Sequence, residues 1–186
     1  QAFGAVKNPT TSVQCWSFYP AKILGVKGDA GAITTNDEKV YEYVKEARNH
    51  FKTDNRDFGG NHRMDNLQAA LLNIKIQHID EILERRKQIA NRYLAQLHGV
   101  VEIANKNSLN WQDFIVNCGI DRDNVYEFLK EQGVETMKNE YPFSTAYPKL
   151  PLAAKYEAET LRLPCNENLT NKEVEYVIEK VKKFYG

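Results

Sequence analysis

The residue that could most clearly do covalent chemistry is Lys22, in the segment Ser17-Phe18-Tyr19-Pro20-Ala21-Lys22-Ile23-Leu24-Gly25. It follows an aromatic and β-branched stretch that is typical of a strand, and glycines follow it at positions 25, 28 and 31. A lysine amine that has lost its proton can attack a carbonyl group, and it can carry a proton between two atoms of a substrate. A lone lysine after a strand is most often an exposed charge, so the chemical interpretation depends on the wider pattern.

Other reactive combinations are weaker. The glycines after Lys22 do not make a P-loop, because no Gly-Lys-Ser/Thr occurs there. The histidines at positions 50, 62, 78 and 98 have no cysteine or carboxylate around them at a metal-ligand spacing, so we expect no metal site. The three cysteines are odd in number and far apart, which favours reduced thiols in a cytoplasmic protein.

The elements that must position Lys22 follow from periodicity. Val13–Tyr19 and Gly31–Thr35 predict two strands with the lysine loop between them, and a capped helix follows towards Arg48. The polar residues 51–62 predict an exposed loop. The chain begins at Gln1 in a small, apolar stretch that is typical of the end of a strand or a buried turn, so we expect further residues upstream.

The second half begins with the longest helical pattern and ends in short elements. One apolar stripe runs from Met64 to Leu97, including His78, with a possible break near Gln77–Asp80. Further elements are predicted after Gly99: strands at Val100–Ala104, Trp111–Cys118 and Val134–Met137, a helix at Asp123–Gln132, an ordered loop at Tyr141–Leu152, and a final helix capped by Thr170–Glu173. The fold class is therefore α/β.

Composition excludes several classes of function. The chain has 186 residues, and its 25 Lys and Arg balance its 25 Asp and Glu, so no overall field attracts nucleic acid or a membrane surface. No apolar run approaches the roughly 20 residues of a membrane helix. We expect a cytoplasmic protein whose partners are neither nucleic acid nor membrane.

Several segments, in this order and spacing, carry a resemblance to a known family. They are Gln1-Ala2-Phe3-Gly4-Ala5, Ser17–Lys22, Gly28-Asp29-Ala30-Gly31-Ala32, Arg48-Asn49-His50, and Gly60-Asn61-His62-Arg63-Met64-Asp65 with Leu67-Gln68-Ala69-Ala70. Together they resemble the DegT/StrS-type nucleotide-sugar aminotransferases, which are pyridoxal-phosphate enzymes of the aspartate aminotransferase fold, fold type I. The resemblance covers nearly the whole chain and corresponds to the C-terminal half of such an enzyme.

The resemblance implies a domain plan. Residues 1–80 would be the C-terminal part of the large cofactor-binding domain, a mixed sheet with helices. Residues 81–186 would be a small α/β domain, with the boundary inside the helical stretch 64–97.

The resemblance also implies roles for single residues. Lys22 would form the Schiff base with pyridoxal 5′-phosphate and would then act as the proton shuttle while pyridoxamine 5′-phosphate forms and is consumed. Ser17 and Asn61 would bind the cofactor phosphate, and Asn61 would reach across a homodimer interface into the partner's site. Gln1 would lie near the cofactor's ring hydroxyl.

The expected reaction moves an amino group from an amino-acid donor, glutamate, to a keto group of a nucleotide-linked sugar, for polysaccharide or glycan assembly. The residues after Lys22 resemble those of family members that act at the sugar 3-position more than those of members that act at the 4-position. Tyr19, His62 and Arg63 are candidates for substrate contacts, although a solvated pair before a helix explains the last two equally well. The alternatives are a dehydratase or synthase of the same fold, or a non-catalytic fragment that lacks the N-terminal half of the site.

The sequence departs from the family pattern in two places. The acidic residue that pairs with the pyridine nitrogen would lie three positions before Gln1, outside this chain. Phe143-Ser144-Thr145 occupies a stretch in which the family often has a histidine, so a nucleotide contact there is in doubt.

Overall fold

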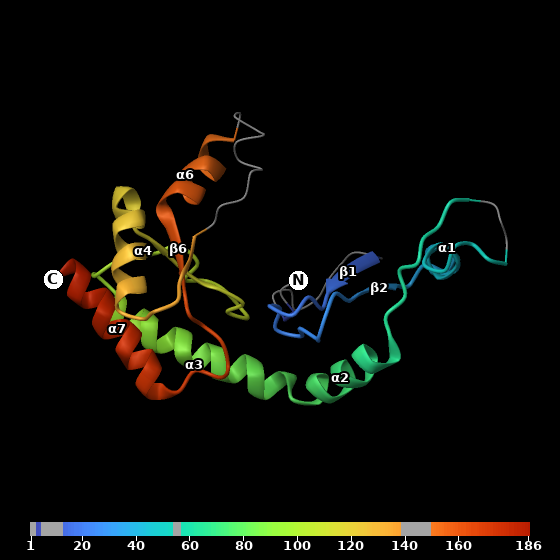
Figure 1. Ribbon diagram of the computed structural model, residues 1–186, viewed down its shortest axis with the longest axis horizontal. Helices are drawn as coiled ribbons and strands as arrows, with labels where there is room; N and C mark the ends of the chain where they lie inside the picture. Colours follow the sequence, from blue (N-terminus) through green and yellow to red (C-terminus); the bar gives the residue numbers. More distant parts are fainter. Residues whose placement is uncertain (1–2, 5–12, 54–56, 139–149) are drawn as a thin grey trace. The chain divides into compact units, whose positions relative to one another are not determined.

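The computed structural model describes residues 3–4, 13–53, 57–138 and 150–186 and divides the chain into two compact units, Gln1–Glu81 and Ile82–Gly186 (Figure 1). Unit 1 contains β1 (Val13–Ser17), β2 (Gly31–Thr35), α1 (Glu38–Ala47), α2 (Asn66–Gln77) and the start of α3 (Ile79–Leu97). Unit 2 contains the rest of α3, β3 (Glu102–Ile103), β4 (Phe114–Asn117), the 3-10 turn η1 (Gly119–Asp121), α4 (Arg122–Glu131), β5 (Met137–Lys138), α6 (Pro151–Glu159), β6 (Thr160–Leu163) and α7 (Asn171–Tyr185).

The centre of unit 1 is the antiparallel pair β1 and β2 (Figure 1). In the register of this pair, Ser17 lies opposite Gly31. The loop that joins the strands buries Leu24 and Val26 beside Phe18 in a small apolar cluster. Leu72 of α2 packs against that cluster. The lysine loop is therefore anchored by its own apolar side chains.

Helices α2 and α3 are separate, which agrees with the possible break near Gln77–Asp80: α2 ends at Gln77, His78 is its C-cap, and α3 begins at Ile79. The prediction of one apolar stripe from Met64 to Leu97 is wrong for the part that forms α2. Leu67, Leu71 and Ile74 are exposed, and so is His78, which contacts Glu81 through Nδ1 at 3.2 Å. Only one side of α2 faces the cluster of unit 1, and the exposed apolar residues lie elsewhere around the helix.

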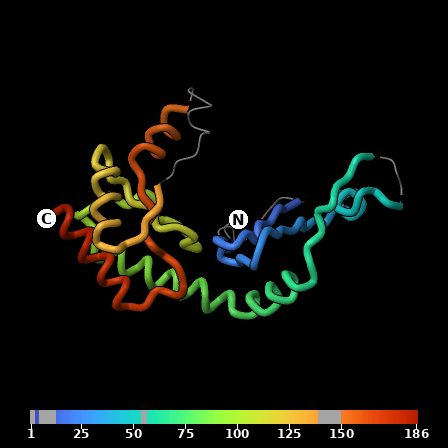
Figure 2. Tube along the Cα trace, in the orientation of Figure 1, coloured from blue at the N-terminus to red at the C-terminus, as the bar shows by residue number. Residues whose placement is uncertain are grey.

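Unit 2 is built on a four-stranded antiparallel sheet in the order β3-β4-β6-β5. Its core joins the inward side chains of β4 and β6 to one face each of α3, α4 and α7, and α4 lies beside α7 (Figures 1 and 2). The fully buried aromatic residues are Tyr93 and Phe114, whose rings are 4.9 Å apart. Burial raises the pKa of the Tyr93 phenol, whose hydroxyl donates to Pro164 O at 2.8 Å.

The predicted elements and their burial need correction at four points. The sequence predicts a loop to Leu152, but α6 begins at Pro151, where the fixed φ of proline suits a first helical position. Strand β6 was not predicted at all. The strand predicted from Trp111 starts only at Phe114, because Trp111 has a φ of 50° that is incompatible with extended backbone. In the predicted exposed loop 51–62, Phe51 is fully buried against Tyr43.

The other predicted elements can be compared only where the structure describes them. The strand at Val134–Met137 is shifted and shortened to β5, whereas the helices after Thr35, Arg122 and Thr170 lie where they were predicted. Most of the predicted loop Tyr141–Leu152, from position 141 to position 149, lies outside the described residues. Among the described residues, no helix is long and apolar enough to cross a membrane.

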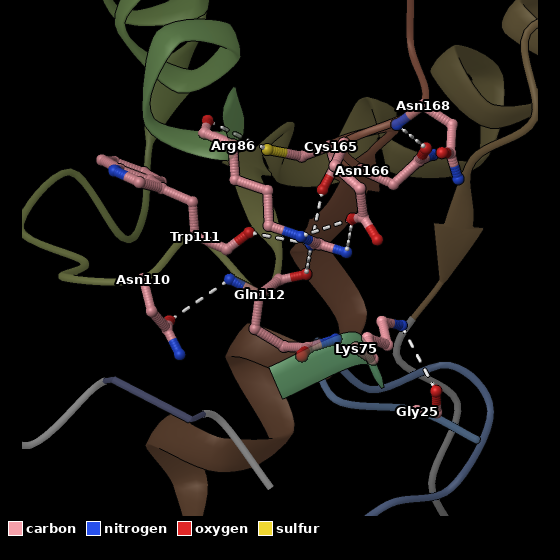
Figure 3. Close-up of polar contacts among 10 residues, drawn as sticks. Gly25, Lys75, Arg86, Asn110, Trp111, Gln112, Cys165, Asn166 and Asn168 are labelled. Carbon is pink, nitrogen blue, oxygen red and sulfur yellow. Dashed lines mark hydrogen bonds and ion pairs between the residues drawn. The ribbon is translucent and has the colours of Figure 1, made fainter. Parts of the chain in front are cut away.

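Arg86 of α3 ties the loops of unit 2 together and is almost fully buried (Figure 3). Its Nε and Nη2 donate to Glu167 Oε2 at 2.9 and 2.8 Å. Its Nη1 donates to the carbonyls of Trp111, Gln112 and Cys165 at 3.2, 3.3 and 2.7 Å. A buried charge is tolerated when it is paired and its donors are satisfied, as they are here.

We predict that Arg86→Met destabilises unit 2 by about 3–5 kcal/mol, because it leaves the Glu167 carboxylate and three carbonyls without their donor. Arg92→Met is the matched control, since Arg92 pairs with Glu175 at 3.1 Å and the two side chains are 39% and 48% exposed, against 6% for Arg86. That variant should lose no more than about 1 kcal/mol. Urea unfolding measures the free energy of unfolding of both variants. Equal losses would show that the buried Arg86 network stabilises unit 2 no more than the Arg92–Glu175 ion pair does.

The start of α7 is closed by a capping box. The Glu173 carboxylate accepts from the Thr170 N–H and hydroxyl, both at 2.7 Å, while the Thr170 hydroxyl accepts from the Glu173 N–H at 3.2 Å. The two bonds from Thr170, led by the backbone one, lower the pKa of the Glu173 carboxyl. The folded state therefore favours the ionised carboxylate.

A lowered pKa in the folded state contributes stability above the ordinary glutamate pKa of 4.5, and that stability is lost as the pH falls through the folded value. We predict that Glu173→Gln unfolds at lower urea than the natural protein at pH 7 and that the difference disappears in acid. Glu135→Gln, at an exposed glutamate outside the box, is the control. A difference that persisted unchanged at low pH would show that the charge is not its cause.

Candidate active site

Lys22 lies in a tight turn between β1 and β2, and its side chain is half-buried. The Lys22 N–H donates to Tyr19 O at 2.9 Å, and the Gly25 N–H donates to Lys22 O at 2.7 Å. Both main-chain groups of the lysine are thus bonded within the turn. The backbone of Lys22 is therefore fixed on both sides, and the amine is the polar group of this lysine that is not used in the turn.

Gly25 is required where the turn closes. A Cβ atom at this position would lie 2.2 Å from Pro20 O and 2.7 Å from Tyr19 O, so no larger residue fits without moving the backbone. The next residue, Val26, is also held in place: its side chain is buried, and its N–H donates to Phe18 O at 2.9 Å. The glycine noted in the sequence thus serves the geometry of the lysine turn.

Ser17 is the last residue of β1 and is half-buried. Its Oγ accepts from the Tyr19 N–H at 3.4 Å. Because the oxygen is the acceptor in this contact, the hydroxyl proton remains to be donated to another group. The chemistry of this side chain fits a phosphate oxygen as its ligand.

Asn61 is held at the end of α1 by residues that are distant in the sequence. It forms an isolated antiparallel bridge with Asn49, flanked by bonds from His50 N to Gly60 O and from His62 N to Arg48 O at 3.2 and 2.9 Å. The motif Arg48-Asn49-His50 therefore packs against the motif that contains Asn61. This pairing places the two motifs side by side in the fold.

Arg63 orients the Asn61 amide. Its Nε donates to Asn61 Oδ1 at 3.1 Å, and its Nη1 donates to Asn49 Oδ1 at 3.0 Å. With the Asn61 oxygen occupied, the amide N–H groups remain for an acceptor outside the chain segment. The sequence offers Arg63 either as a substrate contact or as a solvated residue before the helix, and the contacts seen within the chain are with the two asparagines.

The remaining predicted site residues are exposed or undescribed. Tyr19 and His62 are exposed, and Asp29 is exposed in the loop beyond Lys22. Gln1 lies outside the described residues. Among the described residues, no three His, Cys, Asp or Glu side chains come together where they could hold a metal ion.

A groove of about 860 Å³ lies along β1, β2 and α1. Among the predicted site residues only His62 lines it, and Lys22, Ser17 and Asn61 do not. Its lining is mostly apolar: the set includes Trp16, Ala32, Ile33, Tyr41, Val44 and Met64. The lining also includes the basic residues Lys45, Arg48 and His62.

Sequence reasoning did not assign a role to two residues that hold the site. Asn49 shares the Arg63 guanidinium with Asn61, and Gln68 of α2 donates to carbonyls of the lysine loop. Both residues stand in the motifs quoted above. The available signal was their type and place within those motifs, but the contacts by which they hold the site span 14, 39 and 41 residues of the chain.

Comparison with known proteins connects this geometry to a family. A sequence model of the DegT/DnrJ/EryC1/StrS aminotransferase family matches residues 2–182. The dTDP-3-amino-3,4,6-trideoxy-alpha-D-glucose transaminase of Streptomyces venezuelae is 32% identical, over 94% of this chain and 50% of the relative. The dTDP-3-amino-3,6-dideoxy-alpha-D-galactopyranose transaminase of Aneurinibacillus thermoaerophilus is 33% identical, over 99% of this chain and 56% of the relative.

A solved structure agrees. The crystal structure of S. venezuelae DesV in complex with a ketimine intermediate is 30% identical and superposes with a TM-score of 0.84, over 94% of this chain and 52% of that chain. The chain spans about half the length of the curated relatives it matches. The expected α/β class and fold are confirmed by this likeness, and the chain belongs to the DegT/DnrJ/EryC1/StrS aminotransferase family.

Proposed function

We propose that the natural protein containing this chain is a pyridoxal-phosphate-dependent aminotransferase that acts on a keto group of a nucleotide-linked sugar. The observation that carries the proposal is the fixed turn around Lys22, which leaves a half-buried amine in a chain of this family. Relatives at 32 and 33% identity are named as nucleotide-sugar transaminases. The cytoplasm is the proposed location, which suits the three free cysteines.

The donor and the sugar position are parts of the same proposal. We favour glutamate as the amino-acid donor and the sugar 3-position as the acceptor. The names of the two relatives both specify a 3-amino sugar, and this supports the preference. The product would feed polysaccharide or glycan assembly.

The donor set of the described residues fits a phosphate-bearing cofactor. Ser17 and Asn61 both have their oxygens occupied inside the chain and their protons left to donate, which is what an anionic phosphate requires. When bound, pyridoxal phosphate supplies a reactive carbonyl and an electron sink. Lys22 would hold the cofactor through its amine and would move the proton once an amino donor has replaced that link.

Unit 1 is proposed as the end of the large cofactor-binding domain, and unit 2 as the small domain. The proposed assembly is a homodimer in which Asn61 completes the partner's site. Two features of unit 1 support the dimer. Asn61 is exposed although its amide is firmly oriented, and α2, which follows it, exposes the apolar residues Leu67, Leu71 and Ile74.

We predict that Lys22→Ala abolishes attachment of pyridoxal phosphate that borohydride can reduce, because no other amine would occupy the turn. The natural protein should also release 2-oxoglutarate from glutamate in a single turnover, and the variant should not. Peptide mapping after reduction and an assay of 2-oxoglutarate measure the two results. Lys27→Ala, at an exposed lysine in the same loop, is the control and should behave like the natural protein.

Three results would count against the proposal, each in a different way. Reducible cofactor in Lys22→Ala would remove the lysine from its role. Cofactor attached at Lys22 without release of 2-oxoglutarate from any amino donor would favour a dehydratase or synthase of the same fold. Failure of the natural protein to bind the cofactor would favour a non-catalytic role.

The shared site predicts complementation between two inactive variants. In a dimer of one Lys22→Ala and one Asn61→Ala chain, one site carries both defects and the other carries neither. Random pairing after co-expression should therefore restore about a quarter of the natural activity, since half of the dimers have one intact site. Asn66→Ala in place of Asn61→Ala is the control for a substitution at the start of α2, and its homodimer should be active. If Asn61 served its own chain, no mixed dimer would hold an intact site and no activity would return.

A further inference from the structure

Helix α2 holds the loop that carries Lys22 through two side chains. Gln68 Nε2 donates to Lys27 O at 3.1 Å and to Asp29 O at 3.0 Å. Lys75 lies seven residues, or about two turns, further along the same side of α2, and its Nζ donates to Gly25 O at 3.3 Å (Figure 3). Three alternate carbonyls of one loop thus bond to one face of one helix.

The carboxamide of Gln68 has a second partner at its other end. Its Oε1 accepts from the Asp65 N–H at 3.2 Å, which completes the capping box of α2. Asp65 ends the short segment that begins with Asn61. One side chain therefore connects the lysine loop to the start of the helix that follows the asparagine.

The approach between loop and helix is close. Gly28 has a φ of +84°, and a Cβ atom at this position would lie 3.2 Å from Gln68 Nε2. The loop makes this left-handed turn so that the carbonyls on both sides of Gly28 can reach the same amide nitrogen. Only glycine adopts that backbone readily, so the Gly28 position and the Gln68 contact belong to one arrangement.

We propose that Gln68 is a positioning residue for Lys22. It fixes the backbone at Lys27 and Asp29, and Lys75 fixes Gly25, whose N–H is bonded to Lys22 O. A loop held at these points presents the lysine amine at one place, which lowers the entropy cost of its reaction with a carbonyl. The inference rests on the proposed role of Lys22 as the cofactor's attachment point.

The test uses Gln68→Glu, because this variant keeps the acceptor that caps α2 and removes both amide donors. The protein is the natural one that contains this chain, freed of cofactor. Loss of two bonds should speed hydrogen exchange at the Gly25 and Val26 amides by about tenfold. The rate at which added pyridoxal phosphate is trapped on Lys22 by borohydride should fall by a similar factor, while exchange at Ala69, whose N–H bonds to Asp65 O, stays unchanged.

Gln77→Glu is the matched control, since it makes the same change at an exposed position near the end of α2. It should leave both rates as they are in the natural protein. Lys75→Met removes only the Gly25 contact. It should also speed exchange at the Gly25 and Val26 amides and slow the trapping on Lys22, but by smaller factors than Gln68→Glu. It also keeps the inference open to test should Gln68→Glu fail to fold.

Three results would overturn the inference. Equal behaviour of Gln68→Glu and Gln77→Glu would show that the contacts do not hold the loop. Faster exchange with an unchanged trapping rate would make Gln68 a structural residue only. Absence of trapping on Lys22 in the natural protein would remove both the positioning role and the proposed function. If the natural protein traps the cofactor, Lys22→Ala abolishes the trapping and Gln68→Glu behaves like the natural protein, only the positioning role is removed and the proposed function stands.

Discussion

The reactive lysine lies in a loop without regular structure, so the main-chain polar groups of that loop must find partners elsewhere. Within the loop, Lys22 bonds to Tyr19 and Gly25, and Val26 bonds back to Phe18. The carbonyls beyond them are satisfied by side chains of α2. These hydrogen bonds connect β1, the loop and α2, and the position of the Lys22 amine depends on them.

Unit 2 meets the same requirement with a charged group. Arg86 projects from α3 and satisfies three carbonyls of two loops, with Glu167 as its counterion. Cys165 lies in this network, and burial raises the pKa of its thiol to about 12, so it stays protonated and packs as a small apolar group. In both units a long helical side chain fixes irregular backbone, but the buried guanidinium is the more costly group to remove.

Local patterns predicted much of this fold and little of how the site is held. The capped helices and the strand pair around Lys22 were readable because caps and apolar periodicity are properties of neighbouring residues. Strand β6 was missed because its four residues become a strand only by pairing with β4 and β5. The partners of Gln68 lie 39 and 41 residues away, and Arg63 meets Asn49 across 14 residues. Such contacts follow from the tertiary fold and cannot be read from spacing.

The side chains proposed for the cofactor share one electrostatic property. The Ser17 oxygen accepts from a backbone N–H, and the Asn61 oxygen accepts from the Arg63 guanidinium, so each side chain has its acceptor occupied and its donor left over. Lys22 adds an amine that can donate. Side chains whose donors remain available are complementary to a ligand rich in anionic oxygen. The internal hydrogen bonds of the chain, more than the residue types alone, therefore make these positions suited to phosphate.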